Sequence, residues 1–322
     1  MTVTAVAHPN IALVKYWGKA DAARNLPAVG SISITLDRLT TTTAVEPDAS
    51  LEVDRFELDG SPASEAPAAR VRSCLDLVRK LRPDLPTVRV TSRNSFPTAA
   101  GLASSASGFA ALVTAVNALV EPALGPAELA EIARRCSGSA PRSLVGGFAE
   151  LALVDDGTRL ETLRDPDEWP LEVVIAVTSS ATKSVGSTEG MEHTRTTSPF
   201  YDAWVAASPD DLAAARAAIA ERDFGALATV AEASCLAMHA VAMAARPGLV
   251  YVNGATVECL HRVRDLRRVG SPVFFTIDAG PQLKAICAPG GADDVAAALA
   301  DVPGVVEILR CGLGAGARVT LL

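Results

Sequence analysis

The chain has 322 residues, of which 49% are apolar and 20% charged, and this balance favours a globular protein of two domains. The net charge of −8 argues against a broad nucleic-acid-binding surface, although a few converging cations could still bind a small anion. The N-terminus has no signal-like segment, and no run is apolar enough to predict a membrane span. We therefore expect a cytoplasmic protein that binds neither nucleic acid nor a membrane.

In the first half of the chain, hydrophobic periodicity predicts strands followed by helices. Alternating or β-branched runs predict strands, and apolar residues at helical spacing predict helices. The expected strands are 31–36, 40–45, 88–92 and 146–154, and the expected helices are 70–81, 109–120 and 126–135. The expected loops are 59–69, 97–107 and a polar linker at 155–168.

A new buried strand follows Trp169-Pro170, and it places a domain boundary between residues 1–170 and residues 171–322. In the second half, the expected helices are 210–220, 224–245 and 256–269, and the expected strands are 171–177, 273–277, 283–288, 305–309 and 317–321. The alternation lacks the regular βαβ order of a parallel sheet, so the sequence favours the α+β class.

The six cysteines and four histidines are scattered along the chain. Neither a CxxC pair nor a Cys/His cluster with zinc-ligand spacing is present. We expect free thiols, as is usual for cytosolic proteins, and we assign no role to the histidines.

Residues 94–108 form a loop of Gly, Ala and Ser that joins a predicted strand to an apolar helix. Such a loop lets backbone N–H groups approach a ligand, and the helix N-terminus adds a positive dipole end, which together suit a phosphate. Ser104, Ser105 and Ser107 could donate to phosphate oxygens or hold Mg²⁺. By composition alone, a loop packed through small residues explains the stretch equally well. It is not a Walker A motif, because the Gly-Lys-Ser/Thr ending is missing.

Three further sites carry charged residues in unusual places. Lys15 and Lys19 lie four residues apart in an apolar run, which weakens the usual interpretation of a solvated helix face. Arg142 follows a Ser-Gly-Ser stretch, and its planar fork could hold a carboxylate, although a surface arginine after a turn is the simpler alternative. Asp278 ends an apolar strand before Ala-Gly-Pro, where an acid often serves only the turn.

These stretches together resemble the diphosphomevalonate decarboxylase family of the galactokinase–homoserine kinase–mevalonate kinase–phosphomevalonate kinase (GHMP kinase) superfamily. Four motifs in the expected order carry the resemblance, namely residues 7–19, 97–106, 137–143 and 275–281. Weaker matches occur at residues 187–191, 238–240 and 312–316. The resemblance covers nearly the whole chain. It implies a two-domain GHMP-kinase-like fold, with an N-terminal ribosomal-protein-S5-like domain, a C-terminal ferredoxin-like α/β sandwich and the active site in the cleft between them.

The resemblance also implies an activity. It is the ATP-dependent decarboxylation of mevalonate 5-diphosphate to isopentenyl diphosphate through phosphorylation of the C3 hydroxyl, in the mevalonate route of isoprenoid biosynthesis. ATP and Mg²⁺ would be required, and a homodimer is expected. Asp278 would accept the hydrogen of the hydroxyl, Lys15 would lie near the reacting centre, and Arg142 would bind the carboxylate.

The remaining expected site residues follow from the matched motifs. Those implied for the substrate, besides Arg142, are Tyr16, Trp17, Lys19, Ser137, Gly138, Ser139, Ser187, Thr188 and Met191. Those implied for ATP are Pro97, Thr98, Ala99, Ala100, Gly101, Leu102, Ala103, Ser104, Ser105 and Ser107, with Ser105 also on the metal.

Several positions differ from the commoner pattern of the family. Ala20 stands where an Arg often follows, Cys136 replaces a Gly, Pro141 replaces a Cys, and residues 29–31 replace an Asn- or Asp-bearing approach to the serine strand. These changes affect the expected number of substrate phosphates more than the reaction type. Three alternatives stay open: a phosphomevalonate decarboxylase that makes isopentenyl phosphate, a mevalonate 3-kinase-like enzyme that does not decarboxylate, and a silent nucleotide-binding or regulatory protein.

Overall fold

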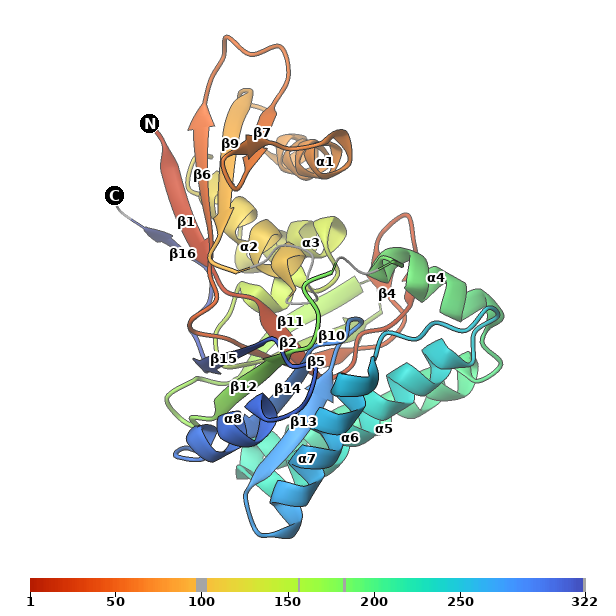
Figure 1. The fold of residues 1–322 in the computed structure, drawn as a ribbon. Coiled ribbons are helices and arrows are strands. Elements are labelled where there is room, and N and C mark those ends of the chain that lie inside the picture. Colours follow the sequence, from red (N-terminus) through yellow and green to blue (C-terminus); the bar gives the residue numbers. More distant parts are fainter. Residues whose placement is uncertain (97–102, 156, 182–183, 321–322) are drawn as a thin grey trace.

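The computed structural model describes residues 1–96, 103–155, 157–181 and 184–320 (Figure 1). A six-stranded sheet lies at one end of the molecule and carries both chain termini, because β16 returns from the far end of the sequence to pair with β1. In sheet order its strands are β16 (Arg318–Thr320), β1 (Val3–Ala7), β6 (Thr41–Pro47), β9 (Val88–Asn94), β7 (Arg55–Leu58) and β8 (Ser61–Pro62).

Helices cover one face of this sheet and enclose an apolar core with it. The helices are α1 (Glu65–Leu81), α2 (Ser104–Asn117) and α3 (Pro126–Cys136). Helix α2 contacts β1 and β6 directly. Its buried residues include Phe109, Leu112 and Val116, which pack against Val45 and Val90 of the sheet. This packing fixes the start of α2 relative to the sheet.

A second, four-stranded sheet lies in the middle of the molecule. In order, it contains β11 (Gly157–Arg164), β10 (Phe148–Val154), β5 (Ser31–Thr35) and β2 (Asn10–Val14). All of its pairs are antiparallel, and β2 forms one edge. The pairing of β2 with β5 shifts register between Ala12 and Val14, just before Lys15. A short hairpin of β3 (Lys19–Asp21) and β4 (Leu26–Pro27) follows along the chain.

The third sheet is antiparallel and belongs to the second half of the chain. Its order is β13 (Val273–Ile277), β14 (Leu283–Cys287), β12 (Glu172–Val177) and β15 (Glu307–Gly312). Side chains alternate between its two faces, as the period of a strand requires. Val173 and Ile175 face the core shared with the middle sheet, and Val174 and Ala176 face a separate core. Because both faces are buried, β12 is apolar from Val173 to Val177, after Glu172 at its start.

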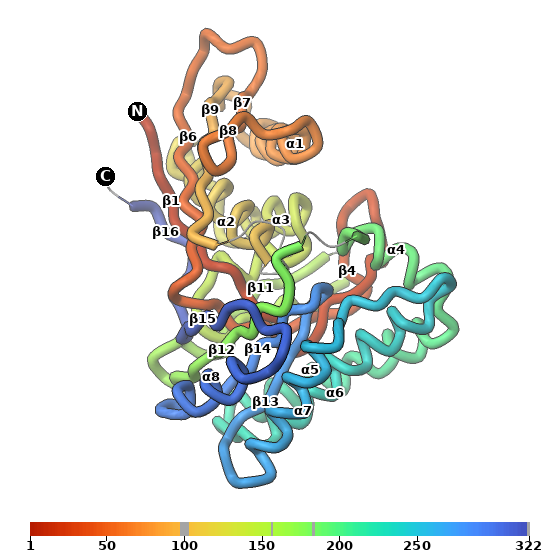
Figure 2. Tube along the Cα trace, viewed as in Figure 1, coloured from red at the N-terminus to blue at the C-terminus, as the bar shows by residue number. Residues whose placement is uncertain are grey.

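Five helices lie in the described part of the second half, and a short 3₁₀ turn, η1 (Ala140–Ser143), precedes β10. The helices are α4 (Ser187–Thr197), α5 (Tyr201–Glu221), α6 (Phe224–Met243), α7 (Gly254–Arg268) and α8 (Ala292–Ala300). Helix α6 packs on β2 and β13, and α7 and α8 cover the other face of the third sheet. The tube view shows the two halves of the chain at opposite ends, with the middle sheet between them (Figure 2).

The α+β class is confirmed, and most predicted elements are present close to their expected bounds. The prediction of a polar linker at 155–168 is wrong, because β11 occupies most of this range and pairs with β10. Helix α5 begins at Tyr201 rather than near residue 210, since Pro209 lies inside it and obscures its first turns. The loops predicted at 59–69 and 97–107 extend too far toward the C-terminus, because α1 begins at Glu65 and α2 at Ser104. Helices α4 and α8 were not among the predicted elements.

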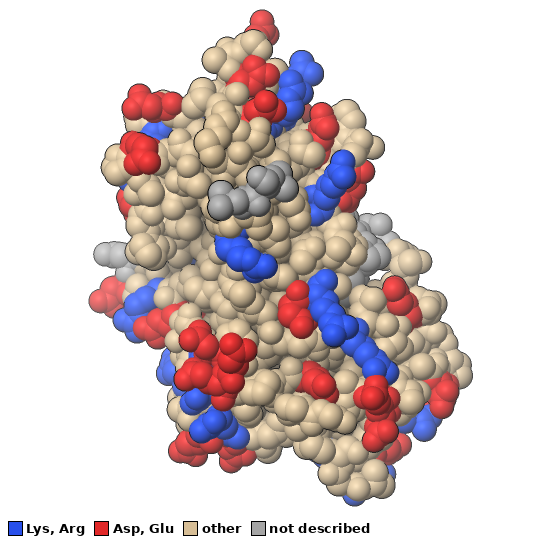
Figure 3. Space-filling view, turned by 90° about the vertical axis from the view of Figure 1, so that its left-hand side faces the viewer, with Lys and Arg blue, Asp and Glu red and all other residues tan. Residues whose placement is uncertain are grey.

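The surface carries charges of both signs (Figure 3), and one helix of the described residues is strongly apolar. Acidic and basic side chains lie interspersed over the face that Figure 3 shows. Among the described residues, one helix, α6, is long and apolar enough to cross a membrane. Core helices meet the same criterion, and buried α6 residues such as Leu227 and Ala231 pack in the core between the sheets.

Candidate active site

Asp278 lies between two buried lysines. Lys15 Nζ is 2.7 Å from Asp278 Oδ1, and Lys284 Nζ is 3.1 Å from Asp278 Oδ2. Both lysine side chains are 1% exposed, whereas Asp278 is 27% exposed. Asp278 lies in the turn after β13 and Lys284 near the start of β14 in the same hairpin, whereas Lys15, at the end of β2, is brought to them only by the tertiary structure.

The charges of this cluster shift the ionisation of its members. Burial alone would raise the pKa of Asp278, but the nearby Lys15 and Lys284 ammonium groups outweigh it and hold that pKa well below its usual range. Burial lowers the pKa of Lys284, and Asp278 partly opposes that change. Asp278 is therefore ionised at neutral pH. With two cations for one carboxylate, the cluster favours the binding of a further anion.

Backbone and side-chain hydrogen bonds hold the strand end that carries Asp278. Lys15 Nζ and Thr276 Oγ1 both donate to Ala12 O, at 2.9 and 3.1 Å, and so join β2 to β13. The backbone N–H of Ile277 donates to Cys235 Sγ of α6 at 3.1 Å. A ring nitrogen of His239, Nε2, lies 3.3 Å from Ile277 O, and burial lowers the pKa of this histidine to about 4, so it is neutral at pH 7.

Arg142 projects from η1 and is almost fully buried. It donates through Nη1 to Ser31 Oγ, while its Nε has no hydrogen-bond partner in the described part of the chain. Burial lowers the pKa of Arg142 to about 10, an effect that Tyr16 and Asp278 partly oppose. The guanidinium stays charged at neutral pH, and a carboxylate could accept from its unpaired edge.

Three serine hydroxyls meet where α2 begins. Ser105 Oγ lies 3.5 Å from Ser137 Oγ, which lies 3.4 Å from Ser139 Oγ. Ser105 is exposed in the first turn of α2, after Ala103 with a left-handed φ of 57°. Asn10, which the sequence analysis did not single out, donates to Ser139 O at 3.0 Å. This row of hydroxyls beside a helix N-terminus could bind phosphate oxygens or a metal that phosphates also hold.

The other residues predicted for ATP lie at the same end of α2 or outside the described residues. Ser104 begins α2 and is half-buried. Ser107 is fully buried, and its Oγ lies 2.6 Å from Thr41 Oγ1, so the protein already engages that hydroxyl. The predicted residues outside the described part of the chain are Pro97, Thr98, Ala99, Ala100, Gly101 and Leu102.

Tyr16 and Trp17 form a wall of the predicted substrate site. Neither Tyr16 Oη nor Trp17 Nε1 has a hydrogen-bond partner among the described residues, although both atoms are buried. Burial raises the pKa of Tyr16 to about 12, so its hydroxyl remains protonated. A Cβ added at Gly138 would lie 2.4 Å from Tyr16 Oη. Tyr16 therefore lies directly against the Ser-Gly-Ser stretch.

The first turns of α4 pack beside Trp17. Ser187 and Thr188 begin the helix, and buried Met191 packs in one apolar cluster with Trp17. Lys19 is half-buried on β3. Its pKa is lowered by burial and by Arg70, against the opposing effect of Glu192. A lysine whose charge is partly desolvated in this way would gain from pairing with an anion.

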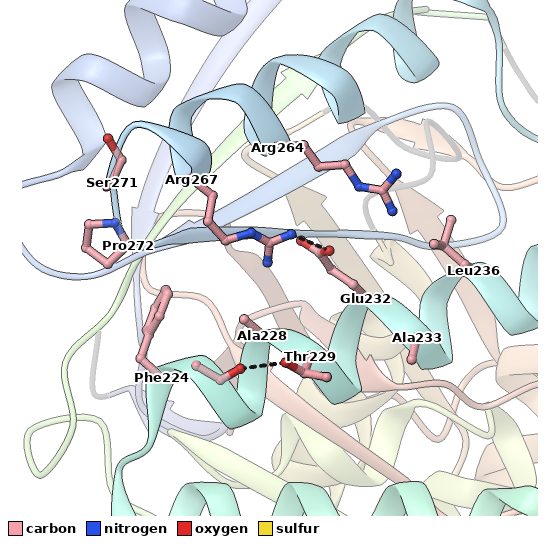
Figure 4. A pocket seen from close by; sticks show the side chains of 12 residues that line it. Phe224, Ala228, Thr229, Glu232, Ala233, Leu236, Arg264, Arg267, Ser271 and Pro272 are labelled. Atoms are coloured by element: carbon pink, nitrogen blue, oxygen red, sulfur yellow. Dashed lines mark hydrogen bonds and ion pairs between the residues drawn. The ribbon is translucent and has the colours of Figure 1, made fainter.

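A closed void lies between the cluster of charges and the start of α2, and it is too small to hold a substrate. Its lining includes Asn10, Ala103, Asp278 and Lys284. A larger pocket of about 700 Å³ lies elsewhere, between α6 and α7, and none of the predicted site residues lines it (Figure 4). Glu232 and Arg267 pair across that pocket at 2.7 Å. The predicted chemistry belongs to the region around Asp278 rather than to the larger pocket, because the convergent charges lie there.

Two domain families match the chain. The diphosphomevalonate decarboxylase-like N-terminal domain matches residues 7–159, and the mevalonate 5-diphosphate decarboxylase C-terminal domain matches residues 173–304. The diphosphomevalonate decarboxylase of Aspergillus fumigatus is 38% identical over 86% of this chain and 74% of that protein. That of Candida albicans is also 38% identical, over 87% of this chain and 82% of that protein. The chain belongs to the diphosphomevalonate decarboxylase family.

Solved structures of the family have the same fold. Mevalonate diphosphate decarboxylase from Staphylococcus aureus superposes with a TM-score of 0.93 at 35% identity, over 99% of this chain and 98% of that one. A structure of MDDEF in complex with MVAPP, AMPPCP and magnesium gives a TM-score of 0.91 at 35% identity, over 100% and 99%. These similarities confirm the expected two-domain GHMP-kinase-like fold. The domain boundary at 170/171 stays a prediction.

The structure also adds residues to the site that the sequence analysis missed. Lys284 is the most prominent, since it pairs with Asp278 from inside the apolar strand β14. A lone lysine in a run of otherwise apolar residues was the available signal, and the same signal had already identified Lys15. Asn10 and His239 gave weaker signals, because a single polar residue in a strand or helix is usually structural.

Proposed function

We propose that the chain catalyses the ATP-dependent decarboxylation of mevalonate 5-diphosphate to isopentenyl diphosphate, releasing ADP, phosphate and CO₂. The observation that carries this proposal is the ionised Asp278 between Lys15 and Lys284, with buried Arg142 acting on the same carboxylate. Relatives of the chain are named diphosphomevalonate decarboxylases, and a solved relative was crystallised with MVAPP and AMPPCP.

Asp278 would align the C3 hydroxyl and accept its hydrogen. A carboxylate whose pKa is held low by two ammonium groups is a weak base, so it would not deprotonate a tertiary alcohol in advance. In a loose phosphoryl transfer the attacking oxygen becomes acidic late, when its bond to phosphorus forms. Orientation by Asp278 and late proton acceptance are therefore consistent with its low pKa.

Arg142 and Lys15 would balance the charges of the second stage. Once the tertiary hydroxyl is phosphorylated, phosphate leaves and positive charge develops at C3. The C–C bond to the carboxylate then breaks, its electron pair forms the alkene, and CO₂ departs. Arg142 would hold the carboxylate through its unpaired edge until that bond breaks. Lys15 would stabilise the departing phosphate.

Substrate and nucleotide would bind through residues on either side of this centre. Tyr16, Lys19 and the stretch 137–139 would hold the diphosphate, which anchors the reacting end. The exposed Ser105 hydroxyl, beside Ser137 at the start of α2, fits an Mg²⁺ shared with nucleotide phosphates. When bound, Mg²⁺ would neutralise charge on the transferred phosphoryl group. The described residues contain no group of three or more His, Cys, Asp or Glu side chains that could hold a metal alone.

The proposal is tested by measuring ADP and CO₂ together, with mevalonate, its 5-phosphate and its 5-diphosphate as substrates. We expect equal amounts of ADP and CO₂ from the 5-diphosphate. The product rate should fall by about 10²–10⁴-fold in Asp278→Asn and stay unchanged in Asp294→Asn, an exposed carboxylate of α8. Activity of Asp278→Asn equal to that of the wild type would refute the role of Asp278.

The same assay separates the alternative functions. Preference for the 5-phosphate would identify a phosphomevalonate decarboxylase, which is the alternative that Ala20 favours because it removes a cation near Lys19. ADP without CO₂ would identify a mevalonate 3-kinase-like enzyme. ATP binding without either product would identify a silent nucleotide-binding protein.

We further propose that the protein acts as a homodimer in the cytoplasm, in contact with neither nucleic acid nor membranes. The net charge of −8 supports the expectation of no nucleic-acid partner, and the family resemblance supports the location and the dimer. Light scattering should give twice the chain mass of 33.2 kDa. A monomer mass, or recovery with membranes after cell fractionation, would contradict the corresponding part of this proposal.

A further inference from the structure

The two lysines that pair with Asp278 are held very differently. Lys284 lies inside β14, which is flanked by strands on both sides: it is opposite Thr276 of β13 and Ile175 of β12. Lys15 follows the edge strand β2 at the point where its pairing with β5 shifts register. Its backbone N–H donates to Ser234 Oγ, and its Nζ also donates to Ala12 O, so the ammonium group keeps one partner when it leaves Asp278. A residue in a doubly paired central strand has little freedom to move, whereas the end of an irregular edge strand can adjust more easily.

We propose that Lys284 is a positioning residue, which anchors Asp278 through Oδ2 so that Lys15 can leave Oδ1 for an anion of the bound substrates. The inference rests on the proposed role of Asp278 and extends it. Lys284 would touch neither the substrate nor ATP, and would act only through the carboxylate.

The need for such an anchor follows from burial. If Lys15 were the sole partner of Asp278, its transfer to a phosphate or carboxylate would leave a partly buried carboxylate unpaired. That carboxylate would then take up a proton and could no longer accept the hydrogen of the hydroxyl. With Lys284 in place, Asp278 keeps one cation throughout, and its free oxygen can receive the hydroxyl.

The other ionisable groups that act on Asp278 do not replace Lys284. Burial raises the pKa of Cys235 and lowers that of His239 to about 4, so both α6 side chains are uncharged at neutral pH. Arg142 acts on Asp278 through its charge but donates to Ser31. Lys15 is the group expected to move. Lys284 is therefore the cation best placed to remain paired with Asp278 when substrates bind.

The first test compares Lys284→Met and Lys284→Arg with the wild type. In Lys284→Met we expect kcat to fall by about 10–10³-fold while KM changes less than about threefold, because substrate binding does not use Lys284. Loss of a neighbouring cation raises the pKa of a carboxylate by about 1–3 units, so the acid limb of the kcat profile should move to higher pH by that amount. Lys284→Arg should restore part of the rate, and Lys80→Met, on the exposed face of α1, should have no effect.

The second test asks whether Lys284 acts through Asp278. In the Asp278→Asn background, Lys284→Met should reduce the residual rate by less than about twofold. Lys284→Gln is made in parallel, because it retains a hydrogen-bond donor if the Met variant does not fold. An unmoved acid limb in a folded variant, or a full further loss of rate in the Asp278→Asn background, would overturn the proposal. Wild-type formation of ADP and CO₂ tests the proposed function separately, whatever the result for Lys284.

Discussion

The hydroxyl of Tyr16 lies against the backbone of Gly138, so that a Cβ at residue 138 would be only 2.4 Å from Tyr16 Oη. This contact joins the end of β2 to the stretch after α3, two segments that are both expected to hold the substrate diphosphate. Glycine is required there by close approach rather than by a turn, and the contact therefore makes the site sensitive to one methyl group.

Gly138→Ala should consequently impair binding. The added methyl group must displace Tyr16, a change that typically costs about 1–3 kcal/mol, so KM for the substrate should rise roughly tenfold. Gly254, at the start of α7, is the matched control, because a Cβ there meets nothing within 4 Å. Gly254→Ala should leave KM unchanged without destabilising the fold. Steady-state kinetics measure KM, and urea unfolding measures the stability of both variants. An unchanged KM in Gly138→Ala would show that Tyr16 can move without affecting substrate binding.

Arg142→Lys should show that the shape of the guanidinium matters as well as its charge. Lysine keeps the charge but loses the fork that could hold a carboxylate with two parallel hydrogen bonds. We expect kcat/KM to fall by about ten- to a hundredfold. Arg216→Lys, which alters an arginine paired with Glu150 away from the site, should retain full activity. Equal activity of Arg142→Lys and the wild type would exclude a bidentate contact.

The ionised state of Asp278 should be visible in stability as well as in catalysis. Because its folded pKa is held below the unfolded value, it stabilises the protein above about pH 4, and this contribution is lost as the pH falls toward the folded pKa. The difference in unfolding free energy between the wild type and Asp278→Asn should therefore shrink by about 1 kcal/mol between pH 5 and pH 3. Urea titrations at both pH values measure it, and a difference that stays constant would contradict the paired carboxylate.

Ser105→Ala should weaken the use of Mg²⁺ and ATP without changing the reaction. Removing one hydroxyl from the row at the start of α2 should raise the half-saturating Mg²⁺ concentration by about three- to tenfold. Thr229→Ala, in the larger pocket between α6 and α7, is a control that should change nothing. Titration of Mg²⁺ at fixed ATP gives the answer. An unaltered Mg²⁺ requirement in Ser105→Ala would remove Ser105 from the metal site.

Local patterns in the sequence determined much of the secondary structure. The alternation at residues 31–36 predicted β5, and the apolar run 273–277 predicted β13 with its observed bounds. These elements are fixed by the period of their own side chains. The same approach failed for β11, whose polar residues look like a linker until β10 pairs with them. It also missed the start of α5, where Pro209 is tolerated inside a packed helix.

The sequence by itself determined the motifs, the α+β class and the residues Lys15, Arg142 and Asp278, because each stands out from its local surroundings. Only the tertiary structure decided which of these residues meet, and that Lys284 joins them from the neighbouring strand. The return of β16 to β1 was equally undetermined, although a strand at 317–321 was expected. Strand pairing and charge pairing join residues more than 250 positions apart, and their energies depend on burial and register, which no local pattern records.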